Sequence, residues 1–280
     1  MGGAIPPAFS SCYSRLVLRT SSLIDKQNIL MQKLAIITGG SKGLGKSLVE
    51  EYCKRGYQVI SIARSSSDYH HPNLRIQIEF DLSDIEHIET SLQDKLKEVF
   101  DNDFDKVTLI NNAATLGQIG KVIDYTATDF NKAVQLNFTS PIAMSNLIIK
   151  LLRSKNTDLS ILNVSSGAAN KAINGWGMYC STKAGLDTIS KVMAGESNGL
   201  GYKIAIVNPG IMDTEMQGAI RNSSQEDFPL VKNFQKYHKD NLLVPPDTIA
   251  RLIAEMDEKN DYENGETVRI EDRFDAPRNQ

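Results

Sequence analysis

Short runs of apolar, largely β-branched residues alternate along this chain with longer segments in which apolar residues recur every three or four positions. The short runs predict buried strands, and the longer segments predict amphipathic helices. Strands are expected over residues 33–38, 57–63, 74–82, 107–113, 159–164, 203–208 and 266–270. Helices are expected between Gly45 and Gly56 and over residues 85–100, 127–153, 176–195 and 247–256.

This alternation predicts a single α/β domain over residues 31–275, with a Rossmann-like, doubly wound parallel sheet of about seven strands. Ligands of such sheets bind beyond the carboxyl ends of the strands. Pro141 predicts a kink in its helix, and Asp247 is expected to cap the last one. Residues 211–245 lack clear periodicity, and a segment of this length is typical of a functional lid.

The first 30 residues differ from the rest. They hold five serines and three basic residues, with Asp25 as the only acid. This composition resembles a transit peptide weakly, which would place the protein in an organelle. A disordered leader or an upstream start is the alternative that we favour, because Met31 opens directly into the first strand.

Composition narrows the function further. With 280 residues and 41% apolar composition the chain can bury a substantial core, and the formal charge of −3 gives no basic surface for nucleic acid. Three widely spaced cysteines fit neither a disulfide framework nor a zinc site, so a reducing compartment, the cytoplasm, is expected. No apolar run approaches the roughly 18 residues of a membrane span. No metal is expected, because the four histidines are not spaced as metal ligands usually are. They are His70, His71, His87 and His238.

A glycine-rich turn follows the first predicted strand. It reads Gly39-Gly-Ser-Lys-Gly43-Leu-Gly45 and leads into a helix and a second strand. Glycines in this strand–turn–helix–strand context allow a tight turn and a close approach of the backbone to a pyrophosphate, which sits at the helix N-terminus. The turn therefore predicts a dinucleotide site.

Tyr179 and Lys183 are four residues apart, so a helix places both on one face. A nearby ammonium group favours the phenolate and lowers the tyrosine pKa from its ordinary value of about 10. The pair would then exchange a proton near working pH. A surface helix pair is the alternative interpretation. The glycine-rich turn and Asn163-Val164-Ser165-Ser166 argue against it.

These motifs together resemble those of the classical short-chain dehydrogenase/reductases, over roughly residues 32–272. The matching elements follow one another in the order typical of the family. They are Thr38-Gly-Gly-Ser-Lys-Gly-Leu-Gly45, Asp81, Asn111-Asn-Ala-Ala114 with alanine in place of the last glycine, Asn137, Ser166 thirteen residues before Tyr179, and Pro209-Gly210. The subgroup looks like the sepiapterin and benzil reductases, through Gly175 to Cys180, Pro209 to Gln217 and Gly265 to Asp272.

The resemblance implies a catalytic set of Asn137, Ser166, Tyr179 and Lys183. Tyr179 would donate a proton to the developing alkoxide, and Ser166 would hold the carbonyl oxygen. Lys183 would bind the nicotinamide ribose, and Asn137 would hold a relay water. Trp176 could wall the substrate pocket or pack the start of the helix.

Asp272 is the remaining substrate candidate. Alignment on the sepiapterin reductase tail places it where an acid would anchor a pterin ring. The alternative is a solvated acid paired with Arg269 or Arg273.

Charge around the second strand predicts NADPH as the cofactor. NAD-binding proteins of this fold place an acid there, whereas this chain has Ala63 followed by Arg64, with Lys42 in the glycine turn. Two cations suit a 2′-phosphate; merely solvated cations are the alternative. The other expected cofactor contacts are Gly39, Ser41, Gly43, Leu44, Gly45, Asp81, Leu82, Asn111, Ala113, Tyr179, Lys183, Pro209, Gly210 and Thr214.

These observations predict an NADPH-dependent carbonyl reductase acting on a ketone or vicinal dicarbonyl, either a benzil-like diketone or a sepiapterin-like pterin. An NADP-dependent alcohol dehydrogenase is one alternative. A non-catalytic NADP-sensing protein is another, although such proteins usually lose part of the catalytic set. Family analogy implies a homodimer through the helices at 127–153 and 176–195.

Overall fold

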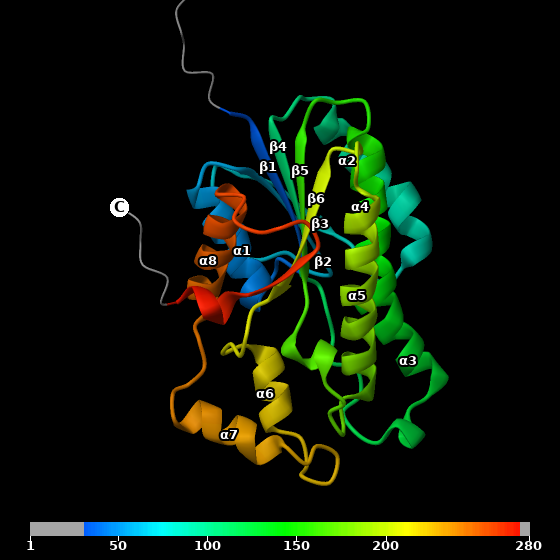
Figure 1. The fold of residues 1–280 in the computed structure, drawn as a ribbon, viewed down its shortest axis with the longest axis vertical. Helices are drawn as coiled ribbons and strands as arrows, with labels where there is room; N and C mark the ends of the chain where they lie inside the picture. Colours follow the sequence, from blue (N-terminus) through cyan, green and yellow to red (C-terminus); the bar gives the residue numbers. More distant parts are fainter. Residues whose placement is uncertain (1–30, 275–280) are drawn as a thin grey trace, which may run out of the picture. The chain divides into compact units, whose positions relative to one another are not determined.

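The computed structural model describes residues 31–274. The segment 1–30 lies outside the described residues, so both interpretations of it, and the compartment, stay predictions. Seven parallel strands form one sheet in the order β3-β2-β1-β4-β5-β6-β7, which confirms the predicted doubly wound sheet (Figure 1). The strands are β1 Lys33–Thr38, β2 Gln58–Ala63, β3 Leu74–Glu79, β4 Lys106–Asn111, β5 Asp158–Val164, β6 Tyr202–Asn208 and β7 Glu266–Arg269.

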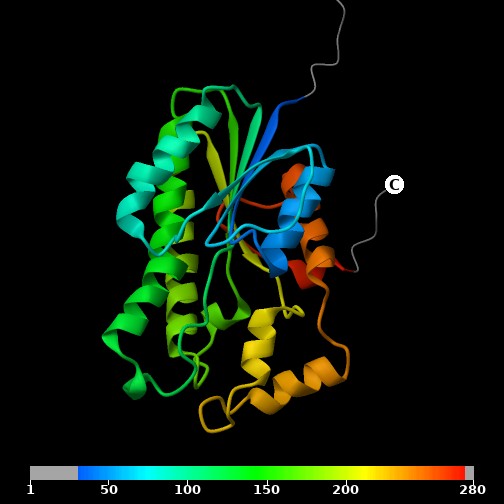
Figure 2. The ribbon, with the colours of Figure 1, turned by 180° about the vertical axis from the view of Figure 1, so that it is seen from behind.

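Helices cover both faces of the sheet. The helices α1 (Gly43–Lys54) and α8 (Pro246–Glu258) lie on one face, and α2 (Gln93–Phe100), α4 (Ser140–Leu152) and α5 (Gly177–Glu196) lie on the other (Figures 1 and 2). Alternate residues of each central strand enter opposite cores. In β1, for example, Leu34 and Ile36 belong to one cluster and Ala35 and Ile37 to the other. Burial on both sides explains why these strands are continuous apolar runs.

The strand order reverses between β1 and β4. The strands β2 and β3 follow one another on one side of β1, and β4 to β7 follow one another on the other side. The strands β1 and β4 are neighbours, and their helices leave toward opposite faces. A crevice forms at such a switch point, beyond the carboxyl ends of the strands. The turns after β1, β4, β5 and β6 all meet at this end of the sheet, which therefore positions the site.

The predicted helix over 127–153 contains a change of helical type. It consists of α3 (Ala127–Val134), a π-helical turn over Gln135–Thr139 and then α4. Pro141 lies in the first turn of α4. Because proline has no N–H, it cannot bond the carbonyl group of Asn137 four residues earlier, which fits the wider turn placed there. The irregularity thus precedes Pro141 and puts Asn137 inside it.

The predicted helix over 85–100 is also composite. A 3-10 turn over Ile85–His87 and a π-helical turn over Ile88–Leu92 lead into α2. Short 3-10 turns also span Val122–Asp124, Gly167–Asn170 and Ile270–Arg273.

Two sequence expectations need correction. Residues 211–245 contain two short helices that the sequence pattern did not indicate, α6 (Glu215–Arg221) and α7 (Val231–Lys239), and the functional lid stays a prediction. Figures 1 and 2 show these two helices together at the carboxyl end of the sheet. Asp247 does not cap the last helix, because α8 begins one residue earlier, and Pro245 occupies the cap position without a side-chain bond.

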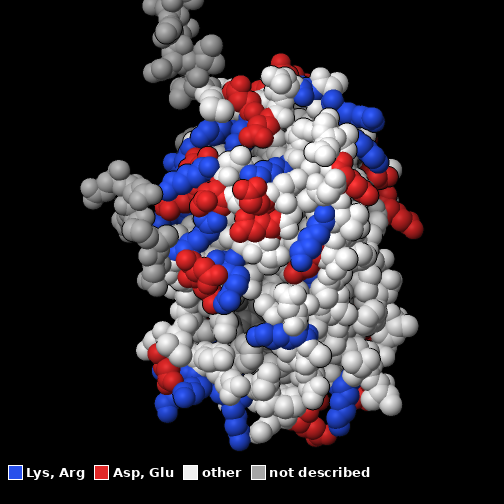
Figure 3. Space-filling model, viewed as in Figure 1, with Lys and Arg blue, Asp and Glu red and all other residues white. Residues whose placement is uncertain are grey.

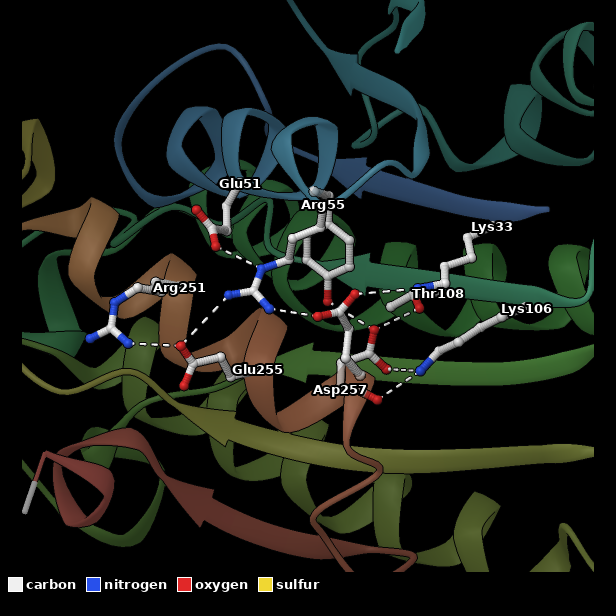
Figure 4. Close-up of polar contacts among 10 residues, drawn as sticks. Lys33, Glu51, Arg55, Lys106, Thr108, Arg251, Glu255 and Asp257 are labelled. Atoms are coloured by element: carbon white, nitrogen blue, oxygen red, sulfur yellow. Dashed lines mark hydrogen bonds and ion pairs between the residues drawn. The ribbon is translucent and has the colours of Figure 1, made fainter. Parts of the chain in front are cut away.

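A buried charged cluster ties α8 to α1 and β4 at the opposite end of the sheet (Figure 4). Asp257 is fully buried, and its Oδ1 lies 3.0 Å from Nζ of Lys106. Its Oδ2 accepts hydrogen bonds from the hydroxyl groups of Tyr52 at 3.0 Å and Thr108 at 2.8 Å. Each of these groups has a polar partner, which is the condition for tolerating buried charge.

The surface carries both signs of charge. Figure 3 shows basic and acidic side chains interspersed over the upper part of one face, with no continuous basic area on that face. Among residues 31–274, none of the helices is both long enough and apolar enough to cross a membrane.

Candidate active site

A cavity of about 320 Å³ lies at the carboxyl ends of the strands. Its walls come from the turns after the six strands β1 to β6, together with α5 and the start of α6. It brings together fourteen of the sixteen residues expected to contact the cofactor, namely Gly39, Ser41, Lys42, Gly43, Leu44, Gly45, Arg64, Asp81, Leu82, Ala113, Tyr179, Lys183, Pro209 and Thr214.

The glycine-rich turn presents free backbone donors to this cavity. Gly39 and Gly43 have φ values of 69° and 53°, and a Cβ atom on Gly45 would lie 2.0 Å from the carbonyl oxygen of Gly39. Lys42 occupies the N-cap of α1 without a side-chain cap bond, and the first turn holds no acid. The first N–H groups of α1 therefore remain available to an anion, as a dinucleotide pyrophosphate requires.

Asn111, expected at the cavity, lies inside the protein instead. Its Nδ2 donates to Oδ1 of Asn163 at 2.8 Å and to Oγ of Ser145 at 3.2 Å. The following residue, Asn112, lines the cavity, and its Nδ2 donates to the carbonyl oxygen of Thr38 at 2.9 Å. Consecutive residues at a strand end point in opposite directions, which is why only one of these two asparagines reaches the cavity.

Gly210 is the second expected residue that does not line the cavity. Its φ is 78°, and a Cβ atom there would lie 2.6 Å from Oε1 of Glu271. Glycine suits this position because of its positive φ, whereas an added Cβ would meet only atoms of the Glu271 side chain.

Several cavity residues were missed by the sequence analysis. Most are immediate neighbours of the recognised motifs or follow a strand directly, and that position is the signal that could have found them. They are Ala63, Ser65, Phe80, Asn112, Ala114, Leu136, Val164, Ser165, Met212, Glu215 and Met216.

Basic side chains lie at one part of the cavity wall. Arg64 follows β2 and is exposed, and Lys42 forms an ion pair with Glu215 at the start of α6. Asp81 accepts hydrogen bonds from the backbone and hydroxyl groups of Ser83. Partial burial acts in the opposite direction, but these bonds and the charge of Arg64 lower the pKa of Asp81. Asp81 is therefore held as a carboxylate.

Tyr179 lies in the first turn of α5 and is 8% exposed. The Ser166 side chain lies beside its phenol group, and the Ser166 hydroxyl oxygen accepts from the backbone N–H of Ala168 at 3.1 Å. Burial raises the pKa of Tyr179, although Ser166 acts in the opposite direction. The expected lowering of this pKa by Lys183 is therefore wrong for this structure, because desolvation favours the neutral phenol.

Lys183 lies one turn further along α5 and is 2% exposed. Its Nζ donates to the carbonyl oxygen of Val164 at 2.7 Å. Burial lowers the pKa of Lys183 to about 8, and the Asp187 carboxylate opposes this shift. The side chain is thus mainly a buried cation at neutral pH.

Asn137 is fully buried within the π-helical turn. Its Oδ1 accepts from the backbone N–H of Thr115 at 2.8 Å, and its Nδ2 donates to the carbonyl oxygen of Thr115 at 2.8 Å and to Oγ1 of Thr182 at 3.1 Å. It thus joins the loop after β4 to α5. The structure assigns this side chain to Thr115 and Thr182, and the relay through a water stays a prediction.

Trp176 packs the start of α5, which was one of its two expected positions. Its ring stacks on Phe228 with centroids 4.7 Å apart and meets Tyr179 edge-on at 5.8 Å. Phe228 and Phe234 belong to the segment 211–245, so Trp176 links that segment to the catalytic helix.

Asp272 lies away from the cavity lining, in the 3-10 turn after β7. Its side chain is 67% exposed, and Oδ2 lies 3.9 Å from Nε of Arg269. The structure therefore shows the solvated ion pair and gives no support to a pterin anchor at this position.

No group of three or more His, Cys, Asp or Glu side chains that could bind a metal ion occurs between residues 31 and 274.

Comparison with known proteins shows what this arrangement belongs to. Residues 33–225 match the family described as short chain dehydrogenase. The chain belongs to the short-chain dehydrogenase family. This confirms the resemblance seen in the motifs. Proteins of this family are oxidoreductases that act on CH–OH or C=O groups and use a nicotinamide cofactor.

Relatives of this short-chain dehydrogenase include benzil reductase ((S)-benzoin forming) of Bacillus subtilis (strain 168). It is 34% identical over 242 residues, which cover 86% of this chain and 99% of that protein. Sepiapterin reductase of Bos taurus is 28% identical over 270 residues, covering 89% and 98%. Among solved structures, the crystal structure of the KRED1-Pglu enzyme has a TM-score of 0.72 and 25% identity, covering 85% and 100%.

Proposed function

We propose that this short-chain dehydrogenase is an NADPH-dependent carbonyl reductase acting on vicinal dicarbonyl compounds. One observation carries the proposal. A single cavity is lined both by Tyr179 and Lys183, with Ser166 beside the tyrosine, and by the basic residues Arg64 and Lys42.

The cofactor preference rests on the residues around the end of β2. Ala63 and Arg64 stand where an NAD-binding protein carries an acid. Arg64 offers a planar guanidinium group for a 2′-phosphate, and Lys42 adds a second cation. The uncapped N-terminus of α1 would hold the pyrophosphate.

The chain's own groups supply orientation and a proton. A bound nicotinamide would provide the hydride. Ser166 would donate a hydrogen bond to the substrate carbonyl oxygen, and Tyr179 would then transfer its phenolic proton to that oxygen. The raised pKa keeps Tyr179 protonated before the reaction. The buried ammonium group of Lys183 would stabilise the phenolate that forms.

The relatives and the cavity walls support a dicarbonyl substrate. A relative at 34% identity is named for reducing benzil. Part of the cavity wall is apolar, because it is formed by Leu136, Met212 and Met216. An apolar wall suits an aromatic or aliphatic diketone. Asp272 is paired with Arg269 outside the cavity lining, so we favour a diketone over a pterin.

The test is a substrate panel run with NADPH and with NADH. Benzil, sepiapterin and a simple aromatic monoketone are compared by the loss of cofactor absorbance. We expect the highest kcat/KM with benzil and NADPH. A preference for NADH or for the monoketone would contradict the proposal. NADPH binding without turnover of any compound would favour the alternative of an NADP-sensing protein. The presence of Ser166, Tyr179 and Lys183 argues against that alternative.

A homodimer is a further part of the proposal. It is supported by exposed apolar side chains on the helices concerned, since Phe130 on α3 is 38% exposed and Val192 on α5 is 46% exposed. Light scattering after size exclusion should give twice the chain mass of 31.0 kDa. A particle of single-chain mass would contradict it.

A further inference from the structure

A second buried charge lies beneath the catalytic pair. Asp187 is one helical turn after Lys183 on α5 and is 6% exposed. The hydroxyl group of Ser165 donates a hydrogen bond to its Oδ1. Ser165 follows β5 directly and lines the cavity, and its own N–H donates to the carbonyl oxygen of Val207 at 2.7 Å.

The end of β5 therefore meets α5 at two successive residues. The carbonyl oxygen of Val164 accepts from Nζ of Lys183 at 2.7 Å, and the hydroxyl group of Ser165 donates to Asp187. The next residue, Ser166, lies beside Tyr179. Three consecutive residues at the end of one strand thus meet three side chains of α5, and two of these contacts are hydrogen bonds.

The charged groups around this contact are few. Lys183 and Lys191, both on α5, act on the Asp187 carboxylate, and Ser165 is its partner from β5. Lys183 faces the ring of Tyr179 and the uncharged end of β5. Within residues 31–274, Asp187 is the charged group that acts on Lys183.

We propose that Asp187 is a positioning residue, which keeps Lys183 charged through its carboxylate and fixes the end of β5, through Ser165, in register with the catalytic helix. This inference rests on the proposed reductase function and adds a residue to its site. Asp187 touches neither substrate nor cofactor in this assignment, since it does not line the cavity.

The physical reason is the position of Lys183 in a nearly dry environment. Burial lowers the pKa of Lys183 to about 8, and the negative charge of Asp187 opposes that shift. Burial also raises the pKa of Asp187, while the bond from Ser165 and the charges of Lys191 and Lys183 act in the opposite direction. Removal of the carboxylate would leave desolvation of Lys183 unopposed, so its proton would be lost at lower pH.

The test compares Asp187→Asn with wild type by measuring kcat for benzil reduction with NADPH from pH 5.5 to 9.5. Wild-type activity should fall as pH rises through about 8. The Asn variant should lose activity about one pH unit earlier, and so be about tenfold slower than wild type at pH 8.5. Glu196→Gln, which removes an exposed carboxylate from the last turn of the same helix, is the matched control and should behave as wild type.

Two further variants separate charge from packing. Ser165→Ala should lower kcat but leave the pH of the falling limb unchanged, because the Asp187 charge remains. Asp187→Glu keeps the charge, so the pH at which kcat falls should also stay as in the wild type. If the Asn variant does not fold, the Glu variant decides. A shift of this pH by a full unit despite the retained charge would overturn the proposal. A lower kcat with an unmoved limb in the Asn variant would also overturn it and leave Asp187 a packing role.

A second readout does not depend on turnover. Because Lys183 lines the cavity, the dissociation constant of NADPH should rise with pH as Lys183 loses its proton. The midpoint of this rise should lie about one pH unit lower in Asp187→Asn. If the wild type reduces no compound of the panel, the proposed substrate fails while this binding curve still tests Asp187. Identical binding midpoints in the two proteins would overturn the role of Asp187 alone.

Discussion

Nζ of Lys183 lies 6.0 Å from the centre of the Tyr179 ring, while its hydrogen bond goes to the backbone carbonyl oxygen of Val164. The hydrogen bond of Lys183 thus goes to the backbone and not to Tyr179, so its charge would act on the tyrosine only through space. Because that charge is buried, it is poorly screened by solvent. Its effect should be largest when the phenol becomes a phenolate, which is the moment of proton transfer.

Replacement of Tyr179 by phenylalanine should lower kcat by about 10²- to 10⁴-fold, the usual contribution of a positioned acid. The affinity for NADPH should change by no more than a few-fold, because only the hydroxyl group is lost. Steady-state kinetics and fluorescence titration measure the two quantities. Tyr237→Phe makes the same chemical change at the edge of the neighbouring aromatic cluster and should leave kcat unchanged. Near-normal turnover in Tyr179→Phe would refute the assignment.

The double substitution Lys42→Ala with Arg64→Ala should weaken NADPH binding far more than NADH binding. Only NADPH carries the 2′-phosphate that these cations would contact. Dissociation constants for both cofactors, measured by calorimetry, give the comparison. Lys54→Ala removes a cation from the other end of α1 and serves as the control. An equal loss for the two cofactors would contradict the assignment of Lys42 and Arg64.

Glu215→Gln tests the ion pair that holds Lys42 in the structure. Both side chains are mostly exposed, at 65% and 72%, so the pair itself contributes little to stability. Removal of the acid should free Lys42 for the phosphate and strengthen NADPH binding by about two- to fivefold, within the range of a surface pair. Binding of NADH should not change. Weaker NADPH binding in this variant would show that Glu215 supports the site.

Gly45→Ala should abolish cofactor binding or reduce it strongly. The added Cβ would lie 2.0 Å from the carbonyl oxygen of Gly39, so the turn would have to move. Gly195→Ala is the matched control, because nothing lies within 4 Å of the added atom and the residue is inside a helix. That variant should gain about 0.5–1 kcal/mol of stability. Calorimetric binding and thermal unfolding measure both effects, and NADPH binding at wild-type strength in Gly45→Ala would contradict the phosphate assignment.

Lys106→Met should lower the free energy of unfolding by about 3–5 kcal/mol, because it leaves the Asp257 carboxylate buried without its cation. Urea denaturation measures this change. Lys33→Met, which removes a partly exposed partner of Glu258, should cost less than about 1 kcal/mol. The double variant Lys106→Met with Asp257→Leu should recover most of the loss. Stability unchanged in Lys106→Met would show that the pair does not stabilise the fold.

The sheet could be predicted because its strands are buried on both faces, which leaves apolar runs such as Lys33 to Thr38 in the sequence. Most of the cavity could be predicted for a related reason. Residues that follow parallel strands meet at one end of the sheet whatever their separation in the chain. Gly43, Arg64 and Tyr179 converge there.

Other features depend on side-chain direction and tertiary contact, which periodicity does not encode. Asn111 and Asn112 are identical in type, and only the strand geometry decides which of them faces inward. The helices α6 and α7 are short, and part of their stability comes from Trp176, which packs against Phe228 and Phe234. The role expected for Asp272 came from analogy with the C-terminal tail of the sepiapterin reductases. In the structure its carboxylate pairs with the nearby Arg269 instead.

The ion pair between Arg55, the C-cap residue of α1, and Glu258 at the end of α8, at 2.6 Å, joins residues that are 203 positions apart in the chain. A ribosome adds roughly 5–20 residues per second, so α1 is complete some 10–40 s before α8 leaves the ribosome. During that time the apolar side of α1, with Leu48 and Tyr52, lacks the cover that α8 gives it in the finished protein. The apolar side of α1 is therefore open to aggregation, and to chaperones, through most of the synthesis of the chain.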